Sequence, residues 1–298
     1  MSDQRDAIIA IEVPLTPGGD VLGRPGMQQG WNSDRASRYA AALVTEIGAN
    51  AGQFSDCLVR AVTLGGGAAT MLGRGVADVM RAVRESCTLA EDVFVTASAS
   101  VSNVSGATFP FFRRAGVRRF DFEMMSLNSA NFTRLNSVDC LADFPLVCDH
   151  FLHAYANRSL GIVLAYGYTG APGEGAVTAC RRSALEAAGS STAHVRLAPV
   201  GNRLAAETPE EREAQRAAMA DALVDRGLIE YLPNQFARPG EEDRFALMDA
   251  AGCPRIGFGA GALTRIDGAI SRNTADFERY CAHADDFALI TDLVAAVA

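Results

Sequence analysis

Short apolar runs alternate with helical patterns along most of this chain, and that alternation limits the possible fold more than any other feature. The runs are short and continuous, as expected for parallel strands that are buried on both faces. Right-handed crossovers then place each helix outside the sheet. Six such units fall short of a closed eight-fold barrel, so we expect an α/β fold, a partial (β/α)6 TIM-like barrel. The expected strands are residues 7–13, 59–64, 93–97, 118–123, 160–166 and 194–199.

Several helices have recognisable starts and stops. Ser33 can cap the first helix, whose apolar positions fall on one face. Thr208 is expected to cap a later helix, with Pro209 at its first position, Glu211 completing a capping box and Gly227 ending it. The other expected helices are residues 75–86, 105–115, 139–157, 175–188 and a last one from residue 275.

The pattern becomes less regular after residue 227. This tail contains 228-LIEYLPNQFARPG-240 and a glycine-rich stretch, 256-IGFGAGA-262. We therefore divide the chain into a barrel formed by residues 1–227 and a short C-terminal extension, residues 228–298, packed on that barrel.

Composition and charge exclude several classes of protein. The net charge is -8, which argues against a nucleic-acid-binding surface because phosphate binding needs a basic face. The local run 113-RRAGVRR-119 is interpreted as a solvated helix end and the start of the next strand. No apolar run approaches the ~18 residues of a membrane span. The polar N-terminus and the scattered cysteines, without a C-x-x-C pair, predict a cytoplasmic protein.

The loop after the first expected strand, 14-PLTPGGDVLGRPGMQQG-30, is rich in glycine and proline. Loops at this position often hold a cofactor in α/β proteins. This loop contains no Cys, His or Lys, and its only charged residues are Asp20 and Arg24.

Two groups of glycines are candidates for ligand binding. Backbone N–H groups in a glycine turn between a strand and a helix can meet a carboxylate or a phosphate. A tight turn without a ligand, or a structural strand end, explains the same residues. The candidates are Gly65, Gly66 and Gly67 in the first turn and Gly257, Gly259 and Gly261 in the second.

A few polar side chains are candidates for chemistry. His150 and His153 share a face of an expected helix, and together with Cys148 they are candidate heme ligands; ordinary helix residues are the alternative. Candidates for proton transfer are Asp20, Asp121, Glu123 and Tyr166. No Ser-His-Asp order or H-E-x-x-H motif occurs.

The series of motifs resembles the radical SAM family of oxygen-independent coproporphyrinogen oxidases and their heme-chaperone relatives. The resemblance runs from Ile8 to about Tyr280. It is carried by the first strand ending in I-E-V-P, the triple-glycine turn, 89-LAEDVFVTAS-98, 115-AGVRRFDFEMMSL-127, 236-FARPG-240, 256-IGFGAGA-262 and the late Asn273. It implies the partial barrel that the strand count also predicts.

The departures from the family concern its radical chemistry. In the family, the loop after the first strand carries C-x-x-x-C-x-x-C, which ligates a [4Fe–4S] cluster that binds S-adenosylmethionine (SAM). Here that loop has no cysteine, so we expect no cluster. The family's ribose-binding acid falls at Ser98, its glutamine at Met125 and a following arginine near Ser137. Its H-N-L-x-Y-W is replaced by 245-FALMDA-250.

Two functions are compatible with this pattern. The first is a cluster-free pseudoenzyme that binds a partner radical SAM protein or a tetrapyrrole such as heme; self-association is a further possibility. The second is a repurposed enzyme that binds SAM or another small molecule at the barrel mouth and catalyses a non-radical transfer or cyclisation. The loop at 14–30 is expected to be mobile or folded over the mouth, as a plug or as a lid over a ligand.

Overall fold

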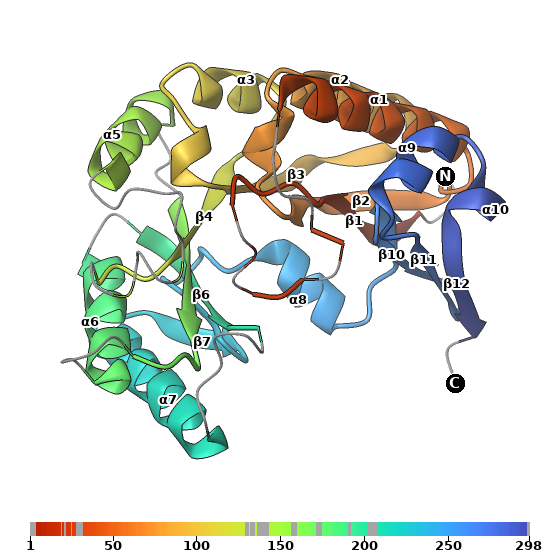
Figure 1. The fold of residues 1–298 in the computed structure, drawn as a ribbon. Coiled ribbons are helices and arrows are strands. Elements are labelled where there is room, and N and C mark those ends of the chain that lie inside the picture. Colours follow the sequence, from red (N-terminus) through yellow and green to blue (C-terminus); the bar gives the residue numbers. More distant parts are fainter. Residues whose placement is uncertain are drawn as a thin grey trace.

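The computed structural model describes residues 4–18, 20, 22–24, 26–27, 32–128, 131, 135, 143–155, 160–170, 175–189, 192–201 and 208–296. Within this part, twelve strands form one sheet in the order β12-β11-β10-β9-β1-β2-β3-β4-β5-β6-β8-β7 (Figure 1). The strands are β1 Arg5–Val13, β2 Cys57–Gly66, β3 Thr88–Ala99, β4 Arg119–Met125, β5 Leu160–Tyr166, β6 Thr192–Pro199, β7 Ile229–Leu232, β8 Gln235–Ala237, β9 Arg255–Phe258, β10 Leu263–Ile266, β11 Ala269–Asn273 and β12 Thr291–Ala296.

Strands β1 to β6 are parallel neighbours, which confirms the predicted α/β barrel topology. The sheet is not closed, because it ends in two edges, at β12 and at β7. Both edges come from the C-terminal segment: β8 and β7 follow β6, while β9 pairs with β1 and leads to β10, β11 and β12. The division of the chain at residue 227 stays a prediction.

Helices cover the outer face of the curved sheet, and one short helix, α8, lies on its inner side (Figure 1). None of the helices in the described ranges is long and apolar enough to cross a membrane. The helices are α1 Ser33–Ala49, α2 Gly75–Ser86, α3 Thr108–Arg114, α5 Phe144–Ala154, α6 Ala176–Gly189, α7 Pro209–Asp225, α8 Arg244–Ala250, α9 Phe277–His283 and α10 Phe287–Ile290.

Helix caps follow the sequence with one correction. Thr208 caps α7 as predicted, because its hydroxyl accepts a hydrogen bond from the Glu211 N–H at 3.1 Å. The prediction for α1 is wrong by one residue: Asn32, not Ser33, is the cap, and its side chain accepts from the Arg35 N–H at 2.8 Å. Asparagine and serine cap helices about equally well, so adjacent candidates are hard to separate by residue type.

The core lies between the sheet and its outer helices. Phe109 and Phe112 of α3 are fully buried in this core and pack on Phe120 with ring centroids 5.3 and 5.4 Å apart. Phe151 from α5 contacts the same ring at 6.1 Å. Edge-on aromatic pairs of this kind contribute about 1 kcal/mol each beyond the area that they bury.

A buried carboxylate joins α1 to the C-terminal segment. Glu46 accepts hydrogen bonds from the Gly259 N–H at 2.7 Å, the Asn273 amide at 2.6 Å and the Tyr280 hydroxyl at 2.6 Å. Burial raises the pKa of Glu46 to about 7, against the lowering effect of these three donors. The late Asn273 thus has a structural partner on the first helix.

Candidate functional site

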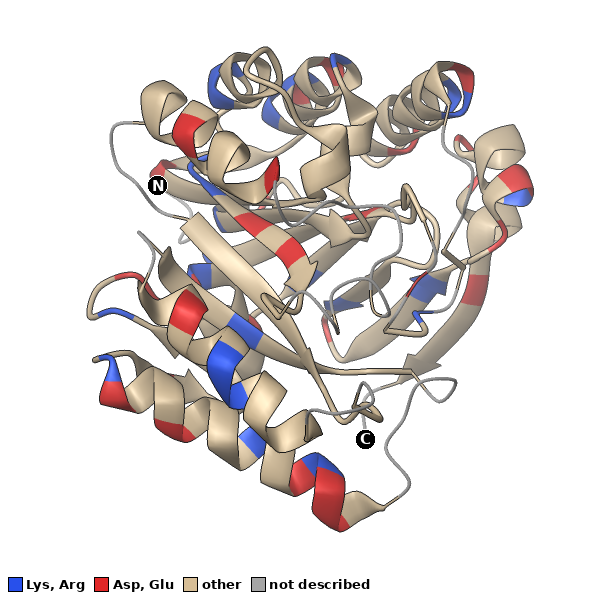
Figure 2. Cartoon of the chain, turned by 60° about the vertical axis from the view of Figure 1, so that its left-hand side comes forward, with Lys and Arg blue, Asp and Glu red and all other residues tan. Residues whose placement is uncertain are grey.

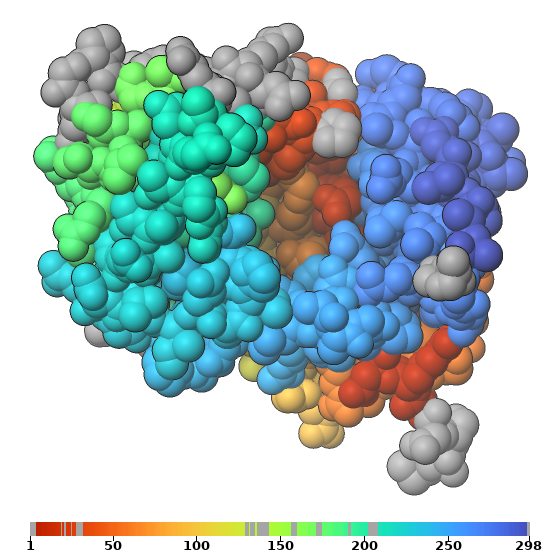
Figure 3. All heavy atoms as spheres, turned by 90° about the horizontal axis from the view of Figure 1, so that it is seen from below, coloured from red at the N-terminus to blue at the C-terminus, as the bar shows by residue number. Residues whose placement is uncertain are grey.

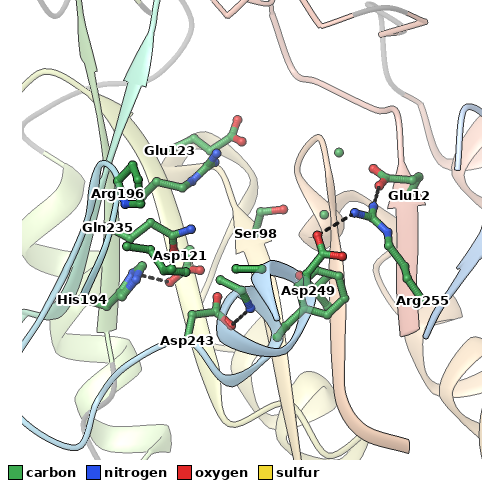
Figure 4. Close-up of a pocket in the computed structure, with 18 of the residues that line it drawn as sticks. Glu12, Ser98, Asp121, Glu123, His194, Arg196, Gln235, Asp243, Asp249 and Arg255 are labelled. Carbon is green, nitrogen blue, oxygen red and sulfur yellow. Dashed lines mark hydrogen bonds and ion pairs between the residues drawn. The ribbon is translucent and has the colours of Figure 1, made fainter. Parts of the chain in front are cut away.

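A cavity of about 570 Å³ lies inside the open barrel. Its wall is formed by inward-facing residues of β1, β2, β3, β4, β6 and β8, and α8 closes one side (Figure 4). In the view from below, the surface is hollowed between the C-terminal segment and the α7 side of the molecule (Figure 3). Pockets of this size accept small organic molecules. Besides the imidazole of His194, its ionisable residues are Glu12, Arg24, Asp121, Glu123, Arg196, Asp243, Asp249 and Arg255.

The opening loop reaches over this cavity through Arg24. The Arg24 guanidinium donates to both carboxylate oxygens of Glu123, at 2.6 and 3.0 Å, and to Asp20 at 2.9 Å. Gly23 packs against Gly201 beyond β6, and Gly26 packs against Ala275 just before α9. The described part of the loop therefore crosses the open side of the barrel, and the cavity remains beneath it.

Two further arginines of the barrel interior also sit between pairs of carboxylates. Arg255 contacts Glu12 at 3.4 Å and Asp249 at 3.2 Å. Burial raises the pKa of Glu12, and the nearby Arg255 and Arg24 oppose that shift.

Arg119 forms the third such group, with Asp121 at 3.0 Å and Asp243 at 2.7 Å. Arg113 and Arg114 end α3 exposed and Arg119 begins β4, as predicted for the run 113–119, and the Arg119 side chain is fully buried. A buried guanidinium is tolerated only with such partners. Charge across the cavity wall is thus organised as carboxylate–arginine–carboxylate groups, which Figure 2 shows in part as red and blue residues along the inner strands.

Asp121 reaches His194 across an intervening strand. The register places Asp121 beside Gly161 on β5, and Gly161 beside His194 on β6. A Cβ on Gly161 would overlap Asp121 Oδ1 and lie 2.8 Å from its Cγ, so glycine is needed there. Asp121 Oδ1 lies 3.9 Å from His194 Nδ1.

His194 is a buried, neutral imidazole. Burial, followed by the nearby Arg119, lowers the pKa of His194 to about 3. Its Nε2 lies 2.7 Å from the Tyr231 hydroxyl, which donates to Gln235 Oε1 at 2.8 Å. His194, Arg196 and Gln235 also line the cavity and were not predicted, because the register of β4, β5 and β6 and the pairing of β8 with β6 place them there.

Contacts within the chain account for most of the candidate glycines. A Cβ on Gly66 would overlap Glu12, and one on Gly67 would overlap Leu15 O and lie 2.6 Å from Val13 O. Gly65 and Gly66 line the cavity. The second group is not among the residues lining it: Gly257 packs on the backbone of Leu263, Gly259 packs on that of Glu12, and Gly261 is in the left-handed region with a φ of 77°.

The other candidates fall into two sets. Asp121 and Glu123 line the cavity, and Asp20 is held by Arg24; their role in proton transfer stays a prediction. The remaining set does not line it: Cys148, His150 and His153 are on α5, and Tyr166 ends β5. His153 is 79% exposed. Among the described residues, no group of three or more His, Cys, Asp or Glu side chains could hold a metal ion.

The family's SAM-binding positions have other roles here. The Ser98 hydroxyl is within hydrogen-bond distance of Gly67 O at 2.5 Å and Leu64 O at 3.2 Å, so its contacts are to the triple-glycine turn. Met125 has a φ of 61° at the end of β4. Ser137 lies outside the described residues.

One known structure has this fold over nearly the whole chain. The coproporphyrinogen III oxidase of Escherichia coli, a radical SAM enzyme, matches with a TM-score of 0.82 at 16% identity, over 99% of this chain and 73% of that chain. Methylornithine synthase gives a TM-score of 0.46 at 10% identity, over 85% and 72% of the two chains. No protein-family model matches this chain, and neither does any curated protein sequence. The shared feature is therefore the radical SAM barrel fold.

Proposed function

We propose that this chain is a cluster-free protein with the radical SAM barrel fold that acts by binding a small polar molecule inside the barrel. One observation carries the proposal. The loop that the resemblance assigns to the cluster has no cysteine and instead directs Arg24 into an ion pair with Glu123, above a cavity of about 570 Å³. The loop that the resemblance assigns to a cluster thus forms an ion pair with the barrel wall, and room for a ligand remains.

The groups that the fold family implies do not fit the residues present. An iron–sulfur cluster needs thiolates, and the loop at 14–30 offers none. In the family that the chain resembles, a carboxylate binds the SAM ribose; the position that the resemblance assigns to it here is Ser98, which contacts backbone carbonyl oxygens. Neither an iron–sulfur cluster nor SAM is therefore part of the proposed function.

A tetrapyrrole fits the cavity less well than a small polar molecule does. A flat macrocycle is held by apolar walls, whereas the apolar side chains lining this cavity are few, chiefly Leu232, Pro233 and Phe245. The candidate heme ligands on α5 are not among the lining residues. Charged and hydroxyl side chains on the other walls suit a compact ligand with its own hydrogen-bonding groups.

Native mass spectrometry of the protein as purified tests the proposal. We expect a retained small molecule, released on denaturation and lost in A246F, because Ala246 lines the cavity and a phenyl ring would fill it. A251F is the matched control, since Ala251 lies at the exposed end of the same helix. A ligand retained equally by both variants, or a stoichiometric cluster after anaerobic reconstitution with iron and sulfide, would overturn the proposal.

A second candidate, a non-radical enzyme, is favoured by one observation. Asp121 and the neutral His194 line the same cavity 3.9 Å apart, which places a carboxylate and an imidazole together beside a bound molecule. Calorimetry with SAM separates two versions of this candidate. We expect no binding heat, because Ser98 replaces the ribose-binding acid; micromolar binding would restore a SAM-dependent enzyme as the better reading.

A further inference from the structure

We propose that Arg196 is the anion-binding side chain of the cavity and that the ligand carries a carboxylate there; this inference rests on the proposed function. Arg196 lines the cavity from β6. Arg24, Arg255 and the deeper Arg119 each contact two carboxylates. Within the described residues, Arg196 alone among these four arginines has neither an ion pair nor a side-chain hydrogen bond.

The sheet register explains why Arg196 lacks a partner. Glu123 on β4, Val163 on β5 and Arg196 on β6 lie in one row. Neighbouring strands are about 4.8 Å apart, so extended Glu and Arg side chains can meet across one strand. Figure 4 shows the Arg196 side chain directed toward Glu123. Glu123, however, is held on both oxygens by Arg24.

The loop therefore has a definite role in this site. By binding Glu123, Arg24 keeps that carboxylate away from Arg196 and leaves the Arg196 guanidinium open to a ligand. Without Arg24, Glu123 would turn to Arg196 and close the anion site with an internal ion pair. Arg24 is thus a positioning residue for the binding site.

The surrounding charges define the class of ligand. Gln235 is the register partner of Arg196 on β8, and its Oε1 accepts from Tyr231, so its amide N–H groups are left to donate. A guanidinium beside an amide donor suits a carboxylate. The charged groups of the interior are Glu12, Asp20, Asp121, Glu123, Asp243 and Asp249 against four arginines, a formal excess of two negative charges. The rest of the ligand is therefore neutral or cationic, and polyanions are excluded.

Saturation-transfer NMR with propionate, its neutral isostere propionamide and the dianion succinate tests this inference in solution. We expect saturation of propionate. Propionamide and succinate should bind with affinities at least about tenfold lower, a loss typical of one charge-assisted contact. R196Q should abolish the propionate signal and R196K should restore part of it. R226Q is the matched control, because Arg226 is exposed at the end of α7.

The role of Arg24 has its own readout. R24A should lose propionate binding about as completely as R196Q, and the double variant R24A/E123Q should recover it, because glutamine cannot neutralise Arg196. Circular dichroism of each variant separates loss of binding from loss of fold. Equal saturation by propionate and propionamide, no propionate signal in the wild type, or binding that survives in R24A would overturn the inference. If propionate binds through Arg196 but no small molecule is retained on purification, the proposed function fails and the anion site stands.

Discussion

Replacing Gly161 with alanine should disrupt the site through Asp121. Its Cβ would overlap Asp121 Oδ1, lie 2.8 Å from Asp121 Cγ and 3.4 Å from Asp121 Cα. The aspartate is too short to bend away without leaving Arg119 and His194. The change therefore acts on a buried ion pair, although it adds only an apolar atom.

The expected loss of stability follows from the ion pair between Arg119 and Asp121, which G161A would break. Breaking one partner of a buried ion pair typically costs 3–5 kcal/mol, as an order of magnitude. Arg119 keeps Asp243 at 2.7 Å, and the Asp121 side chain is 21% exposed, so part of that cost is avoided. We expect G161A to lower the free energy of unfolding by about 2–3 kcal/mol.

Urea denaturation of four proteins checks the reasoning: wild type, G161A, D121A and the double variant. In the D121A background the clash is absent, so G161A should cost less than about 0.5 kcal/mol there. G48A is the matched control: nothing lies within 4 Å of its added Cβ in α1, and alanine there should stabilise the protein by up to about 1 kcal/mol. An equal cost of G161A with and without Asp121 would show that the aspartate is not the cause.

Two further changes test other parts of the structure. Glu46 has a pKa of about 7 in the fold against 4.5 ordinarily, so its contribution is full below pH 4.5 and is lost as the pH rises through 7. That loss amounts to roughly 3 kcal/mol, and the unfolding free energy of E46Q, followed over the same pH range, should lack this slope; parallel profiles would contradict the assignment. For the cap of α1, N32A should destabilise the protein by about 1 kcal/mol and S33A by less than half of that, in thermal or urea unfolding. A larger destabilisation by S33A than by N32A would show that Ser33 is the cap.

Much of the fold was accessible from sequence because its signals are local. A parallel strand buried on both faces is a continuous apolar run, so all six predicted runs overlap β1 to β6, and 160–166 matches β5 residue for residue. The short strands β7 to β12 lack such runs, and their positions depend on pairing with distant segments. The burial of Arg119 could not be predicted for the same reason, because only the fold brings its carboxylate partners, Asp121 and Asp243, to it.

The candidate site was only half predictable. Asp121 and Glu123 could be found because they alternate at the end of a strand, and Asp20 and Arg24 because they are the only charges in their loop. His194 and Arg196 alternate in the same way on β6, but nothing local distinguishes them from residues facing outward. Their place is fixed by the register of β4, β5 and β6, and Gln235 joins them only because β8 adds to the sheet edge in antiparallel fashion.

The structural roles of the glycines also depend on contacts with residues that are distant in sequence. The triple glycine at 65–67 is conspicuous in the sequence, yet Gly66 and Gly67 serve close contact with the end of β1. Gly161 is inconspicuous inside an apolar run, yet it lets a carboxylate pass over one strand to approach an imidazole on the next. In the neighbouring row the same position is Val163, and there Glu123 binds Arg24 of the loop, so that Arg196 has no carboxylate partner among the described residues. Two residues thus decide which side chains pair inside this barrel. Gly161 lets Asp121 approach His194, and Arg24 from the cysteine-free loop binds Glu123.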